Sequence, residues 1–261
     1  MSVIHDQAPD AGGAVAATED FFFDVGGHRL AATTVRTVGG AAPDVVHLHG
    51  LGTTATRHGV RYLLDDLAAH GHASLTFEFS GNGDSTGVMA QATLRRRKEE
   101  TLAAVGLLDG ERRPVLIGTS MGGHLASWAV PQLRPRALVL FCPAAYPADA
   151  ADDAFGDGTR PGNHADSPAF AGIGEFDGDL LIIGARQDQV VSEATVDGYL
   201  AHATKARSRR VIWLDCDHFI HRWLPEQDAV KTEVLDALRS VVTAGTHEPA
   251  DRLANEEGDT E

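Results

Sequence analysis

The sequence predicts an α/β fold in which helices cover both faces of a mostly parallel β-sheet. Three observations lead to this prediction. Short apolar runs recur along the chain, patterns of helical period lie between them, and a pair of glycines near the start separates two strand-like segments. Strands that alternate with helices typically form a parallel sheet, because each helix carries the chain back over the sheet to begin the next strand.

The first two predicted strands form a hairpin. The segment FFFDVGGHRLAATTV contains two strand-like runs around Gly26 and Gly27. A two-glycine turn is a strong hairpin signal, because glycine readily adopts the positive φ angles that such a turn needs. We therefore expect an antiparallel pair of strands at one edge of the sheet.

The apolar runs that follow are continuous rather than alternating, which is typical of strands that are buried on both faces. They occupy residues 45–49, 73–79, 115–117, 137–141, 180–183 and 211–214.

Apolar residues at helical spacing lie between these runs. Residues 60–67 place four apolar side chains on one helical face, and Gly71 stands where that helix would end. Further helical patterns occupy residues 94–108 and 230–242. The basic cluster Arg95 to Lys98 precedes two glutamates, so it is interpreted as an exposed helical face with i,i+4 ion pairs.

Three segments depart from the alternation. Residues 1–18 and the acidic residues 246–261 lack periodicity, so both are predicted to be disordered around a single domain of residues 19–245. Residues 143–176 are rich in Ala, Asp, Gly and Pro and show no clean helix or strand pattern. A long irregular segment inside a compact domain is usually functional, so we interpret it as a short cap.

The composition argues against several classes of function. A formal net charge of −15 disfavours nucleic acid and anionic membrane surfaces as partners, because both require a basic protein surface. No apolar stretch approaches the roughly 18 residues of a membrane span, and no signal-peptide pattern is visible, so we expect a cytoplasmic protein.

The two cysteines, Cys142 and Cys216, are expected to be buried thiols. Neither a metal nor another cofactor is expected, because no H-E-x-x-H, C-x-x-C or phosphate-loop motif is present.

The segment GTSMGG carries the most specific chemical signal. It follows the apolar run 115–117 and precedes a segment that can begin a helix, so Ser120 stands in a G-x-S-x-G motif between strand and helix. In that context the motif places a nucleophilic serine on a strained turn, where a Cβ atom at Gly118 or Gly122 would clash with neighbouring backbone. The alternative is an ordinary turn whose serine caps the helix.

Partners for the serine decide between these interpretations, because a serine hydroxyl attacks only when an oriented base accepts its proton. Asp188 follows the apolar run 180–183, and His218 follows the run 211–214. The carboxyl ends of parallel strands meet at one edge of a sheet. The sequence therefore predicts a triad of Ser120, Asp188 and His218.

Nearby residues compete for two of these positions. Asp215 and Asp217 are acidic, but they lie so close to His218 in sequence that they would approach its Nδ1 atom awkwardly. His221 is expected to belong already to the last helix.

With these residues the chain resembles the α/β-hydrolase family over residues 21–244, and most of all its small carboxylesterases of the cinnamoyl/feruloyl-esterase and serine-aminopeptidase-like branch. The resemblance implies that HLHGLG is the oxyanion loop, in which the backbone N–H of Leu51 acts together with that of Met121. His49 is interpreted as a residue that pins this loop and borders the substrate, whereas His47 is expected to face the packing of the sheet.

A second loop, FEFSGNGDS, resembles the D-x-R-G-x-G-x-S loop of the family and is interpreted as structural. It departs from that pattern, because Glu78 replaces the aspartate and Ser80 replaces the arginine. The charge pairing that the arginine makes in relatives is therefore open here.

The function predicted from the motif and the resemblance is that of a serine hydrolase that cleaves a small-molecule ester or thioester. Tyr146, Phe155 and Phe170 of the cap are expected to contact the acyl substrate, with packing of the cap onto the body as the alternative. Two other functions stay open. An acyltransferase or cyclase would use the same triad and differ in its products, and a binding module would retain the fold alone. The oligomeric state, a homodimer included, is open as well.

Overall fold

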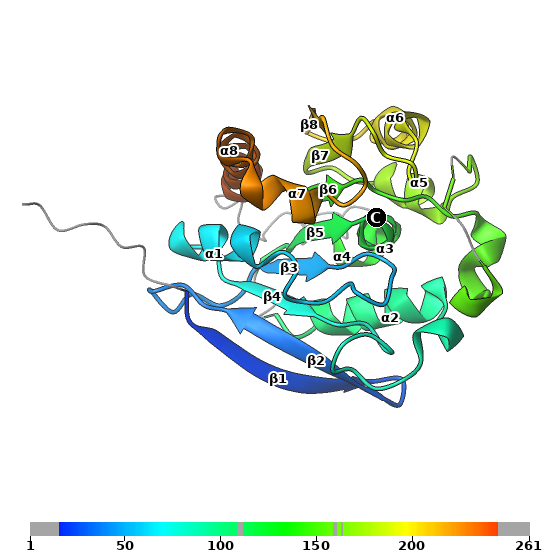
Figure 1. Cartoon of the computed structure of the whole chain (residues 1–261), viewed down its shortest axis with the longest axis horizontal. Coiled ribbons are helices and arrows are strands. Elements are labelled where there is room, and N and C mark those ends of the chain that lie inside the picture. Colours follow the sequence, from blue (N-terminus) through cyan, green and yellow to red (C-terminus); the bar gives the residue numbers. More distant parts are fainter. Residues whose placement is uncertain (1–15, 109–111, 159–160, 163, 245–261) are drawn as a thin grey trace, which may run out of the picture.

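The computed structural model describes residues 16–108, 112–158, 161–162 and 164–244, and these form an eight-stranded sheet with helices around it (Figure 1). The strand order is β1-β2-β4-β3-β5-β6-β7-β8. β2 is antiparallel to both β1 and β4, and every other neighbouring pair is parallel. The strands are β1 (Thr18–Val25), β2 (His28–Val35), β3 (Val45–Leu48), β4 (Ser74–Phe77), β5 (Val115–Thr119), β6 (Ala137–Phe141), β7 (Asp179–Ala185) and β8 (Ser208–Leu214).

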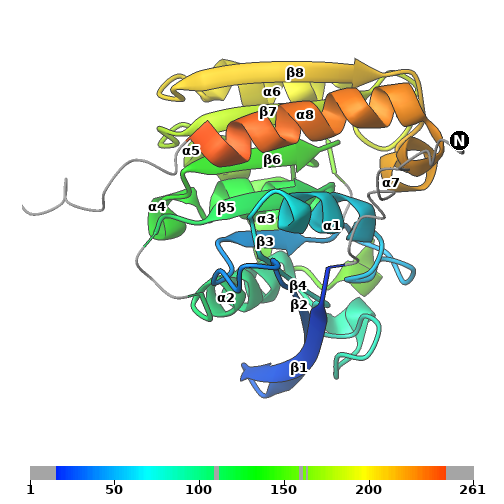
Figure 2. The same ribbon diagram turned by 90° about the vertical axis from the view of Figure 1, so that its left-hand side faces the viewer.

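Helices cover both faces of the sheet, as predicted. α1 and α8 pack on one face, and α2, α3, α5 and α6 pack on the other (Figures 1 and 2). The helices are α1 (Arg61–Ala69), α2 (Leu94–Val105), α3 (Met121–Trp128), α4 (Val130–Leu133), α5 (Pro168–Ile173), α6 (Glu193–His202), α7 (Ile220–Trp223) and α8 (Asp228–Ala244), and the 3₁₀ turns are η1 (Met89–Gln91), η2 (Ala148–Asp152), η3 (Phe155–Asp157) and η4 (Leu224–Glu226).

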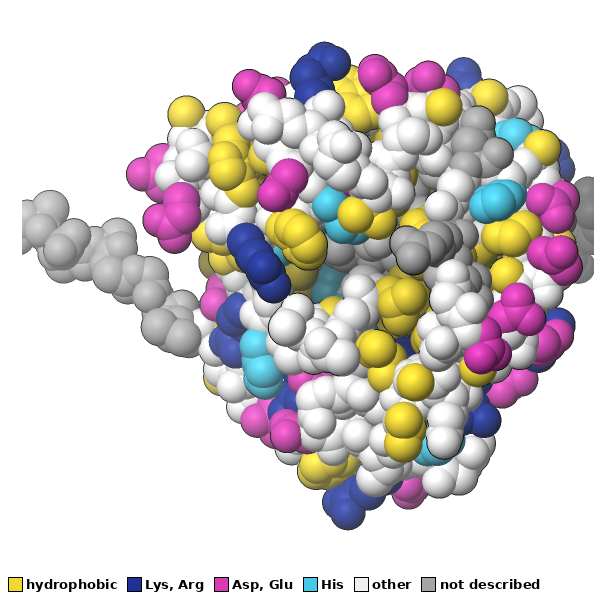
Figure 3. Space-filling view, turned by 45° about the vertical axis from the view of Figure 1, so that its right-hand side comes forward, with side chains coloured by type: hydrophobic (Ala, Val, Ile, Leu, Met, Phe, Trp, Pro, Cys, Tyr) yellow, Lys and Arg dark blue, Asp and Glu magenta, His cyan; other side chains and the backbone are white. Residues whose placement is uncertain are grey.

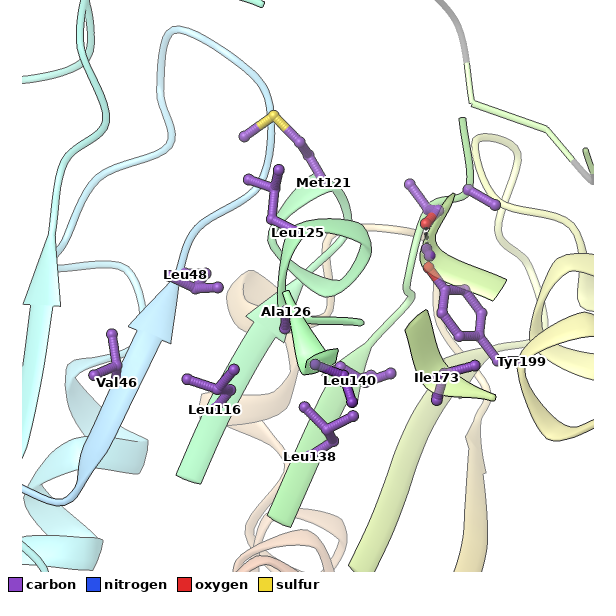
Figure 4. Packing of buried hydrophobic residues seen from close by; sticks show 14 of the residues in the cluster. Val46, Leu48, Leu116, Met121, Leu125, Ala126, Leu138, Leu140, Ile173 and Tyr199 are labelled. Carbon is purple, nitrogen blue, oxygen red and sulfur yellow. Dashed lines mark hydrogen bonds between the residues drawn. The ribbon is translucent and has the colours of Figure 1, made fainter. Parts of the chain in front are cut away.

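Successive residues of the central strands enter two separate cores. Leu116 points toward α3 and packs near Leu125 and Ala126, whereas its neighbours Val115 and Ile117 pack on the face that α1 and α8 cover (Figure 4). This alternation explains why the run 115–117 is apolar at every position, since each face of the sheet needs its own apolar side chains.

The hairpin at the edge is confirmed. Gly26 and Gly27 have φ angles of 56° and 80°, as a two-residue hairpin turn requires. The predicted disorder of residues 1–18 is wrong at its end, because Thr18 is the first residue of β1 and pairs with Val35. Residues 1–15 and the predicted acidic tail, residues 246–261, lie outside the described residues.

The helical patterns are confirmed with changed boundaries. α1 ends at Ala69, and Gly71 follows with a φ angle of 91°. α2 ends at Val105, so Leu108 lies beyond it. His221 belongs to the separate short helix α7 and not, as predicted, to the last helix.

The cap is more regular than its sequence indicates. Residues 143–176 contain two 3₁₀ turns and α5, so the prediction of an irregular segment is wrong for its final part. Pro168 opens α5, where its fixed φ angle suits a first helical turn. The helix spans only six residues, too few for an apolar period to stand out in the sequence.

Candidate active site

Ser120 stands on a strained turn between β5 and α3. Its φ and ψ angles are 52° and −112°, and its backbone N–H donates a hydrogen bond to the carbonyl oxygen of Phe141 at 2.8 Å. The turn depends on close backbone contacts. A Cβ atom at Gly122 would lie 2.0 Å from the carbonyl oxygen of Leu48, and one at Gly118 would lie 2.5 Å from that of Gly122. These positions therefore need glycine, as the motif predicts.

The structure brings the three predicted residues into one hydrogen-bonded chain. His218 Nε2 lies 3.1 Å from Ser120 Oγ, and His218 Nδ1 lies 2.7 Å from Asp188 Oδ2. The side chains of His218 and Asp188 are 13% and 3% exposed, so water competes little for the bond between them. This is the geometry in which a carboxylate orients an imidazole and the imidazole can accept a serine proton.

Asp188 is held as a carboxylate. Burial opposes its ionisation, but hydrogen bonds from His218 and from the backbone N–H groups of Val190 and Val191 outweigh burial and lower the pKa of Asp188. Because an ionised carboxylate only accepts hydrogen bonds, His218 carries its proton on Nδ1. Nε2 is then the free base that faces Ser120.

The competing carboxylates are turned away from His218. Asp215 Oδ1 accepts a hydrogen bond from the Gln187 amide at 2.8 Å, and Asp217 Oδ1 accepts one from the backbone N–H of Phe219 at 2.9 Å.

Cys142 lies beside this chain, directly after β6. Its sulfur, a carboxylate oxygen of Asp188 and a ring nitrogen of His218 all lie within 4.8 Å of one another. Burial and the neighbouring Asp188 charge raise the pKa of the Cys142 thiol, which is therefore protonated at neutral pH. Cys142 and Cys216 are both buried free thiols, as predicted.

The loop after β3 is pinned by His49. The ring donates from Nδ1 to the carbonyl oxygen of Gly50 at 2.7 Å, and its Nε2 accepts from the backbone N–H of Phe79 at 3.1 Å. Within the described residues, the backbone N–H groups of Leu51 and Met121 donate to no other group. They are therefore free to bind a ligand, which is what the oxyanion prediction requires of them.

The acidic side chains of the loop after β4 pair with Arg57, a residue that the sequence analysis does not single out. Arg57 donates from Nη1 to Glu78 at 2.6 Å, from Nη2 to Asp84 at 3.0 Å and from Nε to Thr33 at 3.0 Å. Its side chain is 8% exposed and that of Glu78 is 2% exposed. Arg57 comes from the β3–α1 loop, so the carboxylates of the loop after β4 are paired with an arginine from another segment.

The basic cluster of α2 is only in part the exposed face that the sequence predicts, because Arg95 is exposed but Arg97 is not. Arg97 is fully buried, with its guanidinium over the rings of Phe79 and Phe155, and burial lowers its pKa to about 10. Arg95 pairs with Asp152 of the cap and not with a residue of its own helix. A charged residue that tertiary contacts bury cannot be told from an exposed one by helical spacing.

A cavity of about 180 Å³ opens beside Ser120. Figure 3 shows the face to which the parallel strands point, hollowed near its centre, with hydrophobic and histidine side chains around the hollow. The cavity is lined by His47, His49, Gly50, Leu51, Thr54, Ala55, Thr56, Gly59, Val60, Thr119, Ser120, His218, Phe219, Ile220, His221 and Arg222.

The cap residues predicted to contact substrate do not line this cavity. Tyr146 and Phe170 are each 1% exposed, and Phe170 stacks on His202 and packs against Tyr199. Phe155 packs over Arg97. The alternative of packing onto the body therefore describes all three, whereas His49 does border the cavity, as predicted.

Another hollow, of about 270 Å³, lies at the opposite ends of the strands. Its lining includes Arg134, Glu175, Asp177 and Lys205, which precede β6, β7 and β8. This hollow is therefore separate from the hydrogen-bonded residues Ser120, His218 and Asp188.

The sequence matches a family model with the description alpha/beta hydrolase family over residues 45–254. The chain belongs to this family. The α/β hydrolase therefore has the fold that its motifs predict, and the match extends from the start of β3 to beyond His218.

Solved structures share the fold of this α/β hydrolase at low sequence identity. The thioesterase domain from the curacin biosynthetic pathway has a TM-score of 0.62 and 14% identity, with 84% of this chain and 99% of that chain covered. The CarC serine hydrolase of carbazole degradation has a TM-score of 0.64 and 17% identity, covering 85% and 100%. Est1E from Butyrivibrio proteoclasticus, solved with ferulic acid, has a TM-score of 0.62 and 19% identity, covering 84% and 99%.

No curated protein has a significantly similar sequence. In the part of the α/β hydrolase that the structure describes, every helix is too short or too polar to cross a bilayer.

Proposed function

We propose that the protein is a serine hydrolase that cleaves a carboxylic ester or thioester through an acyl-enzyme. The observation that carries this proposal is the hydrogen-bonded chain from Asp188 through His218 to Ser120 on a strained turn. Structural neighbours titled as a thioesterase domain and as a ferulic-acid-bound enzyme support acyl chemistry on this fold.

In the first half-reaction, Ser120 Oγ attacks the acyl carbon while its proton moves to His218 Nε2. Asp188 accepts the Nδ1–H bond throughout and stabilises the imidazolium that forms. The backbone N–H groups of Leu51 and Met121 bind the oxyanion, where such donors contribute about 3–4 kcal/mol each. His218 then returns the proton to the departing oxygen or sulfur, which leaves the acyl group on Ser120.

Water completes the cycle. His218 Nε2 takes a proton from the water as it attacks the acyl carbon, and the proton passes to Ser120 Oγ as the acid departs. In this scheme each proton that His218 accepts is returned to a leaving group.

The first prediction concerns Ser120. We expect Ser120→Ala to lower kcat for a short p-nitrophenyl ester by about 10⁴-fold or more, because the nucleophile is lost. The wild-type protein should also form a fluorophosphonate adduct on Ser120, identified by peptide mass.

Ser240→Ala is a matched control, because Ser240 is an exposed serine on α8. It should keep normal turnover. Near-normal activity of Ser120→Ala, or a wild-type protein that forms no Ser120 adduct, would refute the proposed function.

A further inference from the structure

The cavity beside Ser120 contains three histidines besides His218, and their hydrogen bonding differs. His47, His49 and His221 all line the cavity. A neutral imidazole has one donor and one acceptor nitrogen, so each ring needs two partners when it is buried.

Two of these rings are fully partnered. His49 bonds to the carbonyl oxygen of Gly50 and to the N–H of Phe79. His221 Nε2 lies 2.8 Å from Thr119 Oγ1, and its Nδ1 lies 3.0 Å from the Tyr62 hydroxyl. Neither ring has a nitrogen left for a ligand.

His47 is the exception among them. Its Nδ1 lies 3.2 Å from Thr76 Oγ1, but its Nε2 has no hydrogen-bond partner among the described residues, although the side chain is only 1% exposed. A buried polar atom without a hydrogen-bond partner is unfavourable. In a residue that lines the cavity, such an atom points to a partner that is not part of the chain.

The neighbours of His47 determine which nitrogen carries the proton. Thr76 Oγ1 lies 3.3 Å from the carbonyl oxygen of Arg57, which can only accept, so the single hydroxyl hydrogen of Thr76 is directed there. Thr76 Oγ1 must then accept from His47, which places the ring proton on Nδ1. Burial, with contributions from His221 and His49, lowers the pKa of His47 well below its usual value, so the ring is neutral and Nε2 presents a lone pair.

We propose that the cavity binds a small substrate group that bears a hydrogen-bond donor, a hydroxyl or an N–H, and that His47 Nε2 accepts this hydrogen bond. The inference rests on the proposed function for the identity of the reaction and adds the specificity of the site. It also extends the expected role of His47 in sheet packing, because the ring bonds to Thr76 of β4 and His47 lines the cavity as well.

The volume limits the size of the group. A cavity of 150 Å³ accommodates benzene, so about 180 Å³ corresponds to one substituted ring or a short branched chain. Val60 and Ile220 contribute apolar side chains to the lining. The substrate group is therefore mainly apolar and carries one donor.

The test compares substrates that differ only in the donor. One set consists of p-nitrophenyl esters of hydroxybenzoic and methylbenzoic acids substituted at each ring position. The other consists of acetate esters of the corresponding hydroxybenzyl and methylbenzyl alcohols, so that the acyl and alcohol sides are both examined. We expect kcat/KM for at least one hydroxyl member to exceed that of its methyl partner by about tenfold or more.

Two variants test whether His47 causes the preference for the hydroxyl substrate over its methyl partner. His47→Leu should reduce the hydroxyl-to-methyl ratio of kcat/KM to about one, whatever its effect on the overall rate, because the Nε2 acceptor is removed. Thr76→Val retains the ring but removes the acceptor that holds the proton on Nδ1, so it should lower the same ratio by an intermediate factor. Fluorophosphonate labelling of Ser120 shows that each variant is folded.

A binding measurement makes the test independent of turnover and of the variants. In protein labelled with ¹⁵N-histidine, the free His47 ring should show a protonated Nδ1 and an unprotonated Nε2. Phenol should shift the Nε2 resonance, whereas toluene, its methyl counterpart, should not.

The outcomes separate the two proposals. Absence of both ester hydrolysis and Ser120 labelling in the wild-type protein refutes the proposed function, and the phenol titration still decides the role of His47. If hydrolysis proceeds but every matched pair reacts within about threefold, or if the ratio is the same in His47→Leu, the inference is overturned. A ring protonated on Nε2 overturns it as well.

Discussion

At Gly122 the first turn of α3 lies directly against the end of β3. The Cα atom faces the carbonyl oxygen of Leu48, and an added Cβ atom would stand 2.0 Å from that oxygen. Backbone atoms on both sides leave no flexible side chain to move. The lack of a side chain at Gly122 thus allows the Ser120 turn to approach the end of β3.

We predict that Gly122→Ala destabilises the fold by roughly 1–3 kcal/mol, the range for forced overpacking, and slows fluorophosphonate labelling of Ser120. Urea unfolding and labelling rates measure the two effects.

Gly39→Ala is the matched control, because a Cβ atom there would meet nothing within 4 Å. Its unfolding free energy should change by less than about 0.5 kcal/mol. Equal unfolding free energies for the two variants would contradict the steric account.

At the scale of elements, Arg57 joins the β3–α1 loop to the loop after β4. It contacts Glu78 and Asp84 of the second loop, and it also bonds to Thr33 of β2. The Arg57 and Glu78 side chains are nearly excluded from water, so each charge depends on the other for its stabilisation. The ion pair therefore supports the loops on one side of the cavity.

We predict that Arg57→Met lowers the unfolding free energy by about 3 kcal/mol, because it leaves the Glu78 carboxylate buried without its partner. The double variant Arg57→Met, Glu78→Leu should recover part of this loss, because no buried charge remains. Equilibrium unfolding in urea measures both.

The comparison is with Arg95→Met. Arg95 also forms a pair with an aspartate, Asp152, but the two side chains are 53% and 68% exposed. Its loss should lower the unfolding free energy much less than the loss of Arg57, because water screens an exposed pair. Similar costs at Arg57 and Arg95 would show that burial does not strengthen the first pair.

At the scale of the whole molecule, several histidines are buried in their neutral form. Burial lowers the pKa of His49 to about 3 and that of His124 to about 3, and burial together with His218 lowers that of His221 to about 4. In the unfolded chain the same rings have a pKa near 6.5. The unfolded state therefore binds more protons than the folded state below pH 6.5, so stability must fall as the pH falls.

We predict that the unfolding free energy is nearly constant above pH 7 and decreases by about 3 kcal/mol between pH 6.5 and 5.5, from these three histidines together. The unfolding free energy continues to fall as the pH is lowered toward the pKa values of these histidines in the folded protein. Asp44 and Asp188, whose pKa values are lowered in the folded protein, act in the same direction at lower pH. Urea unfolding at several pH values measures the slope.

His124→Leu tests the origin of this slope. Neither ring nitrogen of His124 has a hydrogen-bond partner among the described residues, so the substitution removes one titrating group without breaking a bond. The slope below pH 6.5 should decrease by about one proton. An unchanged slope would show that His124 does not contribute.

Most of the fold could be predicted because its signals are local. Continuous apolar runs, helical spacing and the Gly26-Gly27 turn each depend on a few neighbouring residues. Segments without such a period were predicted less well, as the first residues of β1 and the short helix α5 show.

The sequence by itself determined the succession of the main strands and helices along the chain, the turn at Ser120, and the two positions from which Asp188 and His218 reach it. These follow from short motifs and from the rule that parallel strands end at one edge. The tertiary structure alone decided that Arg57 pairs with Glu78, that Arg97 is buried, and that Tyr146 and Phe170 pack in the core while His47 borders the cavity. Each of these outcomes depends on contacts between segments far apart in the chain, and burial and hydrogen bonding exist only once those segments meet.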